Sequence, residues 1–164
     1  MLRKLLTIFL ILSATVLHAA SKPADSAFKK MLSLAGEWDG KDAEGMPVHS
    51  SFKPVISGTA LMETISPHGM EEMLTLYSVD GDAIQLSHYC PTNNQPRMRA
   101  VVTRADPQVL DFQFTGAGNL QDISVGHQHR LVIQFEDADH IVESWTWRQK
   151  NHDSPMIFHL QRTK

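Results

Sequence analysis

The chain has 164 residues, of which 42% are hydrophobic and 20% are charged, and its formal net charge at pH 7 is −3. A mildly acidic chain without a basic patch argues against a nucleic-acid partner. Cys90 is the single cysteine, which excludes an intrachain disulfide.

The chain begins with the pattern of a secretory signal peptide. Arg3 and Lys4 precede an uncharged apolar run over residues 5–17, and small residues close it. The run is shorter than the roughly 20 residues that a membrane span needs. We predict a signal peptide over residues 1–20 and a periplasmic or secreted bacterial protein without a membrane span after cleavage. An uncleaved anchor is the alternative.

The remaining residues, 21–164, are predicted to form one domain, and their length allows a substantial core. Apolar residues at helical spacing predict a short helix over 25–34, with Asp25 or Ser26 as its N-cap. After Trp38 the hydrophobic period changes to two, which marks strands with one buried face. We predict about ten strands, near residues 35–41, 46–56, 59–65, 70–79, 83–90, 96–104, 109–115, 128–136, 140–148 and 155–163.

The turns between these strands are of two kinds. Four are tight: 57–58, 80–82, 105–107 and 137–139. The others are mostly longer: 66–69, 91–95, 115–126 and 149–154. In an up-and-down meander, this order puts the tight turns at the Trp38 end and the longer loops at the opposite, loop-rich end. Such a sheet hides its edges by closing, so the predicted fold class is an all-β, up-and-down antiparallel barrel with a short N-terminal helix.

The segment Gly-Glu-Trp at 36–38, between a short helix and a meander, resembles the calycin group of lipocalins, fatty-acid-binding proteins and nitrobindin-like barrels. In lipocalins the tryptophan lies across the closed end beneath an arginine from the last strand, and Arg162 is the matching residue here. The resemblance therefore implies a lipocalin-like barrel with structural roles for Gly36, Trp38 and Arg162.

Two further resemblances concern parts of the chain beyond this segment. The nitrobindin-like variant implies a haem held by a histidine late in the chain. His159 is the candidate, but it is out of phase with Phe158 and Leu160, so we expect it to face solvent. The whole chain after residue 20, with segments 88–90, 94–98 and 143–147, also resembles an uncharacterised family of exported bacterial proteins, which implies no activity.

Histidine and cysteine gather at the loop-rich end. His88 and Cys90 are two residues apart on one predicted strand, and His127 and His129 are two apart on another. By strand parity both pairs face the apolar side. Imidazole and thiolate bind zinc or copper, so these four residues are candidate metal ligands. The alternative is that they are polar rim residues bonded to loops.

Charged residues offer a second kind of site. If Met98 points inward, Arg97 points outward and is solvated. In the opposite orientation of the strand, Arg97 points into the opening of the barrel at the loop-rich end, called the mouth below. There it can hold a carboxylate. Glu63 and Glu143 are each in phase with apolar neighbours, and two inward carboxyl groups can do acid–base work if burial raises a pKa. The alternative for each glutamate is an arginine partner or exposure to water.

The catalytic motifs for nucleophilic, phosphate-binding or zinc-protease chemistry are absent from the sequence. We therefore favour a non-enzymatic role: an exported protein that binds a small, partly apolar molecule inside the barrel, reached from the loop-rich end. The expected ligand-binding residues are His88, Cys90, Arg97, Met98, His129 and Trp145. Two alternatives stay open: a metal- or haem-dependent enzyme or sensor, with zinc, copper or haem as cofactor, and a filled barrel that acts through its surface.

Overall fold

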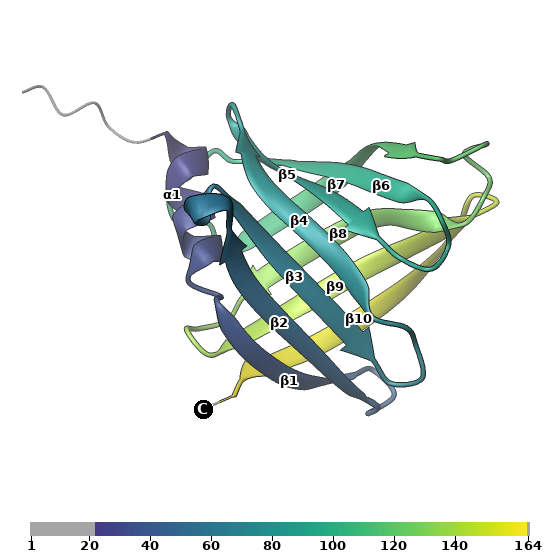
Figure 1. The fold of residues 1–164 in the computed structure, drawn as a ribbon, viewed down its shortest axis with the longest axis horizontal. Coiled ribbons are helices and arrows are strands. Elements are labelled where there is room, and N and C mark those ends of the chain that lie inside the picture. The colour runs from purple at the N-terminus through teal and green to yellow at the C-terminus, as the bar shows by residue number, and fades with distance from the viewer. Residues whose placement is uncertain (1–21, 164) are drawn as a thin grey trace, which may run out of the picture.

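The computed structural model describes residues 22–163, which form a closed antiparallel barrel of ten strands with one α-helix (Figure 1). Neighbouring strands follow chain order around the barrel, and β1 closes it by pairing with β10. The predicted fold class is therefore confirmed. The predicted signal peptide, residues 1–20, lies outside the described residues. Within residues 22–163, no helix has the length and apolarity that a membrane crossing requires.

The observed strands lie close to the predicted ones. They are β1 (Gly36–Asp42), β2 (Pro47–Val55), β3 (Ala60–Pro67), β4 (Met73–Asp80), β5 (Ala83–Tyr89), β6 (Gln95–Val101), β7 (Val109–Gly118), β8 (His127–Phe135), β9 (His140–Gln149) and β10 (His152–Arg162). A short 3₁₀ turn, η1 (Ile56–Gly58), joins β2 to β3.

The helix α1 (Pro23–Leu32) begins earlier than predicted. Lys22 is its N-cap residue and makes no side-chain capping bond, so the prediction of Asp25 or Ser26 as the cap is wrong. Proline has a fixed φ suited to the first helical position and lacks the N–H that a cap would satisfy. Pro23 therefore starts the helix where the sequence offers no polar cap.

Two connections differ from the predicted turns. β9 and β10 are joined by only Lys150 and Asn151, with φ values of 49° and 61°, so the predicted long loop at 149–154 is wrong. Two consecutive positive φ values are typical of a tight hairpin turn. In contrast, β6 ends at Val101, so the connection to β7 is longer than the predicted turn at 105–107.

One end of the barrel is closed by Trp38, Arg162 and α1. Trp38 is fully buried and donates a 2.8 Å hydrogen bond from Nε1 to the Leu34 carbonyl. The Arg162 guanidinium lies 4.4 Å from the centre of the indole ring and donates to the carbonyls of Ser33 and Ala35 at 2.8 Å each. Figure 1 shows α1 and the C-terminus at this end.

A close approach of backbones accounts for one glycine of the segment around Trp38. A Cβ atom at Gly40 would lie 1.9 Å from the carbonyl oxygen of His159 on β10. Only glycine lacks this atom, so Gly40 allows β1 and β10 to pair where the barrel closes.

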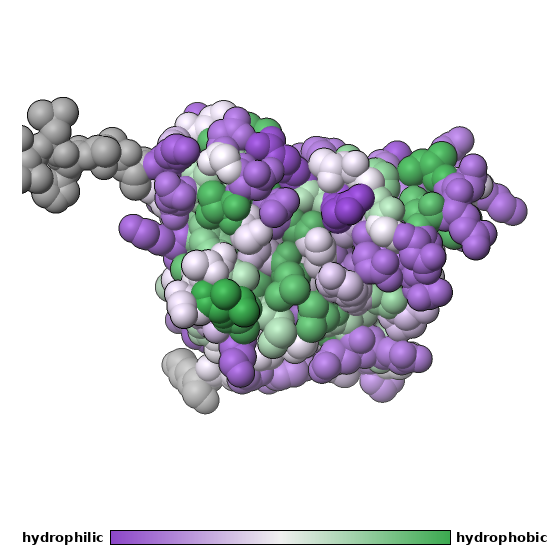
Figure 2. Space-filling model, turned by 45° about the horizontal axis from the view of Figure 1, so that its top comes forward, coloured by the Kyte–Doolittle hydropathy of each residue, from purple (hydrophilic) through white to green (hydrophobic). Residues whose placement is uncertain are grey.

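Large side chains are buried in the barrel interior. Trp145, Tyr77, Phe112 and Met98 are among those that are essentially inaccessible to solvent. On the outer face drawn in Figure 2, hydrophobic groups interrupt a mostly hydrophilic surface. The unusual feature of this core is that charged and polar side chains are buried with the apolar ones.

Candidate functional site

Two glutamates from separate arcs of the barrel meet in its interior. Glu63 lies on β3 and Glu143 on β9, strands that are not neighbours in the sheet, and both side chains are fully buried. Both glutamates therefore point inward, the first of the two alternatives considered for them. Their carboxyl groups hydrogen-bond to each other, which requires a shared proton because a carboxylate has no donor.

The surroundings of the pair decide which carboxyl group holds this proton. Burial raises the pKa of both, and the negative charge of Glu63 raises the pKa of Glu143 further. Tyr77 and Ser50 donate to Glu63 at 2.6 and 3.1 Å, which stabilises its ionised form. Trp145 Nε1 donates to Glu143 Oε2 at 3.1 Å, and no donor among the described residues reaches Oε1. Glu63 is therefore the ionised member, and Glu143 carries the proton.

A row of polar side chains runs from Glu63 through β4 to His88 on β5. Tyr77 donates to Glu63, and the Thr75 hydroxyl on the same strand lies 2.9 Å from His88 Nδ1. The other ring nitrogen, His88 Nε2, has no partner among the described residues, and it accepts a hydrogen bond in the tautomer that carries its proton on Nδ1. Burial lowers the pKa of His88 to about 4, so the imidazole is neutral at pH 7.

Trp145 contacts both His88 and Glu143. Its indole packs against the His88 ring with centroids 4.6 Å apart, and its Nε1 donates to Glu143. His88 and Glu143 thus lie against the same indole, although they come from β5 and β9. The interior site consists of Ser50, Glu63, Thr75, Tyr77, His88, Glu143 and Trp145.

Besides Glu143 Oε1, three interior polar atoms lack a partner within residues 22–163: His88 Nε2, Asn94 Oδ1 and Gln128 Oε1. Asn94 donates its Nδ2 to the Gly126 carbonyl at 3.0 Å, which leaves its oxygen free. All three residues belong to the loop-rich end, in or beside the connections after β5 and before β8. A buried acceptor without a donor is unfavourable, so this end of the interior suits a molecule that supplies hydrogen-bond donors.

A second cluster lies at the mouth, on a β-bulge between Gln128 and Arg130. His127 and Gln128 are consecutive and both buried, so the simple alternation expected for this strand is interrupted. Phe114 packs against both His127 and His129, with ring centroids 4.8 and 4.9 Å away. The bulge therefore brings two histidines and one phenylalanine together.

The mouth histidines form a hydrogen-bonded series that starts at the surface. Arg148, held by Asp153 at 2.6 and 2.7 Å, donates to His129 Nε2 at 2.5 Å. His129 Nδ1 then donates to His127 Nε2 at 3.1 Å, and His127 Nδ1 donates to the Val125 carbonyl at 2.7 Å. These bonds occupy all four imidazole nitrogens, and both rings are held as neutral tautomers.

The four candidate metal ligands do not converge. Within the described part of the chain, no three His, Cys, Asp or Glu residues are placed to hold one ion. His88 lies in the interior, whereas Cys90 is half-buried beside the Thr92 hydroxyl, with Sγ and Oγ1 2.9 Å apart. His159 is exposed on the outer face of β10, as expected, and therefore does not fit the axial-ligand role that the resemblance implies for a haem.

The predicted ligand-binding residues are divided between the interior and the surface. His88, Met98 and Trp145 are buried in the interior, whereas His129 is half-buried at the mouth. Arg97 is exposed, because Met98 and Ala100 occupy the inward positions of β6. The structure thus places Arg97 on the solvated outer face, the first of the two phases considered.

Sequence reasoning did not single out Tyr77 and Thr75. Both faces of the segment 70–79 carry apolar residues, so hydrophobicity alone did not show which residues of this strand point inward. The cross-strand row that places Thr75 between Glu63 and His88 follows from the register of β3, β4 and β5. The signal that could have found this row is that three adjacent strands each carry a polar residue at an inward position: Glu63, Thr75 and His88.

The barrel resembles solved structures in fold. It matches the crystal structure of Rv2717c from M. tuberculosis with a TM-score of 0.61 and 12% sequence identity, over 84% of this chain and 98% of that one. It also matches a protein of unknown function from the DUF3598 family of Nostoc punctiforme, with a TM-score of 0.55 and 10% identity over 81% of this chain. This chain covers 49% of the Nostoc protein.

No family model matches the sequence, and no curated protein is similar to it. At identities of 12% and 10%, the two structural similarities support the barrel fold alone.

Proposed function

We propose that this chain is an exported binding protein that holds a small, partly apolar molecule with hydrogen-bond donors at the loop-rich end of the barrel interior. The observation that carries the proposal is a set of buried polar atoms without partners: His88 Nε2, Asn94 Oδ1 and Gln128 Oε1. Each would gain a hydrogen bond from an amine, amide or hydroxyl group of a ligand.

The surroundings of these acceptors indicate the rest of the ligand. The Trp145 indole, which packs against His88, and the Met98 side chain, which is paired across the strands with Leu86, are buried and offer apolar contact. Ligand sites combine such apolar lining with a few polar groups that orient the molecule. The ionised Glu63 favours a neutral or cationic ligand over an anion.

The test is a change in melting temperature of the purified protein with matched pairs of small aromatic probes. Benzylamine and benzyl alcohol carry donors, whereas toluene and ethylbenzene do not. We expect the donor-bearing probes to raise the melting temperature, since a ligand that binds only the folded state stabilises it. If none of the probes changes it, or if all change it alike, the proposed donor specificity is wrong.

A matched pair of variants locates the effect. His88→Leu removes the acceptor from the interior, whereas His159→Leu makes the same exchange on the exposed face of β10. We expect His88→Leu to weaken binding of the donor probes by about tenfold, the effect of one lost hydrogen bond of about 1.4 kcal/mol. His159→Leu is expected to bind as the unaltered protein does. Equal affinities for the two variants would favour the filled barrel that acts through its surface.

A further inference from the structure

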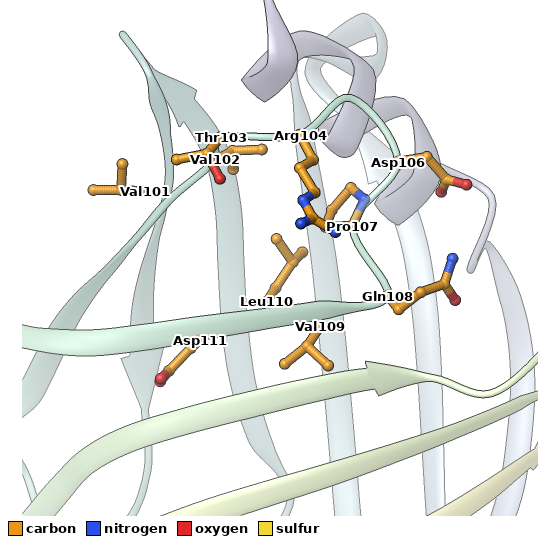
Figure 3. A pocket seen from close by; sticks show the side chains of 10 residues that line it. All are labelled: Val101, Val102, Thr103, Arg104, Asp106, Pro107, Gln108, Val109, Leu110 and Asp111. Atoms are coloured by element: carbon orange, nitrogen blue, oxygen red, sulfur yellow. The ribbon is translucent and has the colours of Figure 1, made fainter.

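The strands β6 and β7 separate at the Trp38 end of the barrel. Their pairing extends only to Arg99 and Gln113. Beyond these residues, 100–101 remain paired with β5, and 109–112 remain paired with β8. A pocket of about 370 Å³ lies between the separated strand ends and beneath the connection 102–108 (Figure 3).

Four aliphatic side chains line this groove together with polar ones: Val101, Val102, Val109 and Leu110. Val101 and Val109, at the end of β6 and the start of β7, are 60% and 49% exposed. Val102 and Leu110 are buried below them. Two large exposed apolar residues that face a hollow are better covered than solvated.

The charges around the groove leave one cation without a partner. Asp106 is paired with Lys30 at 2.6 Å, and Asp111 is held by Arg130 at 2.7 and 2.8 Å. Arg104 has no hydrogen bond or ion pair with any residue of 22–163. Figure 3 shows its side chain reaching from the connection into the groove, above Leu110 and beside Pro107.

We propose that this groove binds an anionic amphiphile, an alkyl chain that ends in a carboxylate. Arg104 pairs with the carboxylate, for which a guanidinium is geometrically suited. Val101 and Val109 contact the alkyl chain, and the pocket volume is in the range of small-ligand sites. This site lies at the opposite end of the barrel from His88 and is independent of the interior site.

The test is a titration of the ¹⁵N-labelled protein with sodium octanoate below its micellar concentration, followed by backbone amide shifts. We expect saturable shifts for residues 101–111. Octanol, which lacks the charge, and acetate, which lacks the chain, are expected to bind more weakly. Shifts confined to the barrel interior, or equal affinities for octanoate and octanol, would overturn the proposal.

Two arginine variants and one histidine variant complete the experiment. Arg104→Gln is expected to weaken octanoate binding about three- to fivefold, the effect of one exposed ion pair. Arg97→Gln removes an exposed arginine from the other end of β6 and is the matched control, with unchanged affinity expected. His88→Leu is expected to leave octanoate binding unchanged, so failure of this site is distinguishable from failure of the interior site. An Arg104→Gln variant that binds as tightly as the unaltered protein would overturn the assignment.

Discussion

The Tyr77 hydroxyl donates a 2.6 Å hydrogen bond to Glu63 Oε2, and both side chains are fully buried. Removing the donor leaves the buried, ionised carboxyl group of Glu63 with fewer hydrogen bonds. We predict that Tyr77→Phe lowers the free energy of unfolding by about 1–3 kcal/mol, measured by urea denaturation. Tyr89→Phe on the exposed end of β5 is the control, with a change below about 0.5 kcal/mol expected. Equal effects would show that the buried bond contributes nothing.

The buried carboxyl pair predicts how stability depends on pH. Burial raises the pKa of Glu63 and Glu143 above the ordinary value of 4.5, which both have in the unfolded chain. Above that pH the folded chain binds more protons than the unfolded chain. The pair therefore contributes stability that is complete below pH 4.5 and is lost as the pH rises through the folded pKa values.

We predict that Glu143→Gln, which cannot ionise, makes the decline in stability above pH 6.5 less steep, by up to about 1.4 kcal/mol per pH unit. Burial lowers the pKa of His88 to about 4 from 6.5, so its opposite contribution changes only below this window. Denaturation curves at several pH values measure the effect. Parallel profiles for the variant and the unaltered protein would contradict a protonated Glu143.

The contact between Arg148 and His129 predicts a change in titration. Burial lowers the pKa of His129, and the positive charge of Arg148 lowers it further. We predict that Arg148→Gln raises the pKa of His129, as followed by the imidazole Cε1–H resonance in an NMR titration. Arg130→Gln, which removes an exposed arginine paired with Asp111, should leave it unchanged. A pKa that stays the same in Arg148→Gln would show that the arginine charge does not reach the ring.

The approach of β10 to Gly40 predicts a large effect of one methyl group. Gly40→Ala would place Cβ against the His159 carbonyl, and we predict a loss of about 3 kcal/mol or more in unfolding free energy. Gly81→Ala is the comparison, because nothing lies within 4 Å of its Cβ and only its φ of +66° opposes alanine. Its expected loss is about 1 kcal/mol. The reverse order in thermal or urea denaturation would contradict the strand pairing at the closure.

The arginine that covers Trp38 should contribute more than a surface arginine. Arg162 donates to several carbonyl groups at the closed end and lies over the indole. We predict that Arg162→Gln costs about 2–3 kcal/mol of unfolding free energy. Arg130→Gln, which breaks an exposed ion pair, should cost at most about 1 kcal/mol. Equal losses in urea denaturation would argue against a stabilising role for Arg162 at this end.

The local pattern of the sequence was enough to predict about ten strands, their approximate bounds and the inward position of His88. It also placed Glu63 and Glu143 in phase with apolar neighbours, with their orientation left open. Alternation with a period of two is imposed by the strand itself, so it can be read without knowledge of the neighbours. The closing of the sheet also followed, since so many strands with one apolar face must hide their edges.

The tertiary structure decided which of these inward groups meet. Whether Glu63 on β3 reaches Glu143 on β9 depends on the register summed around the barrel, and no single strand carries that information. The bulge at Gln128 and the separation of β6 from β7 are likewise departures from regular strand pairing. Alternation of apolar and polar residues in the sequence does not predict such departures. The sequence alone therefore determined the barrel and the inward position of His88. The closed tertiary structure decided which polar groups meet inside it, which buried polar atoms stay unpaired, and where the groove beside Arg104 forms.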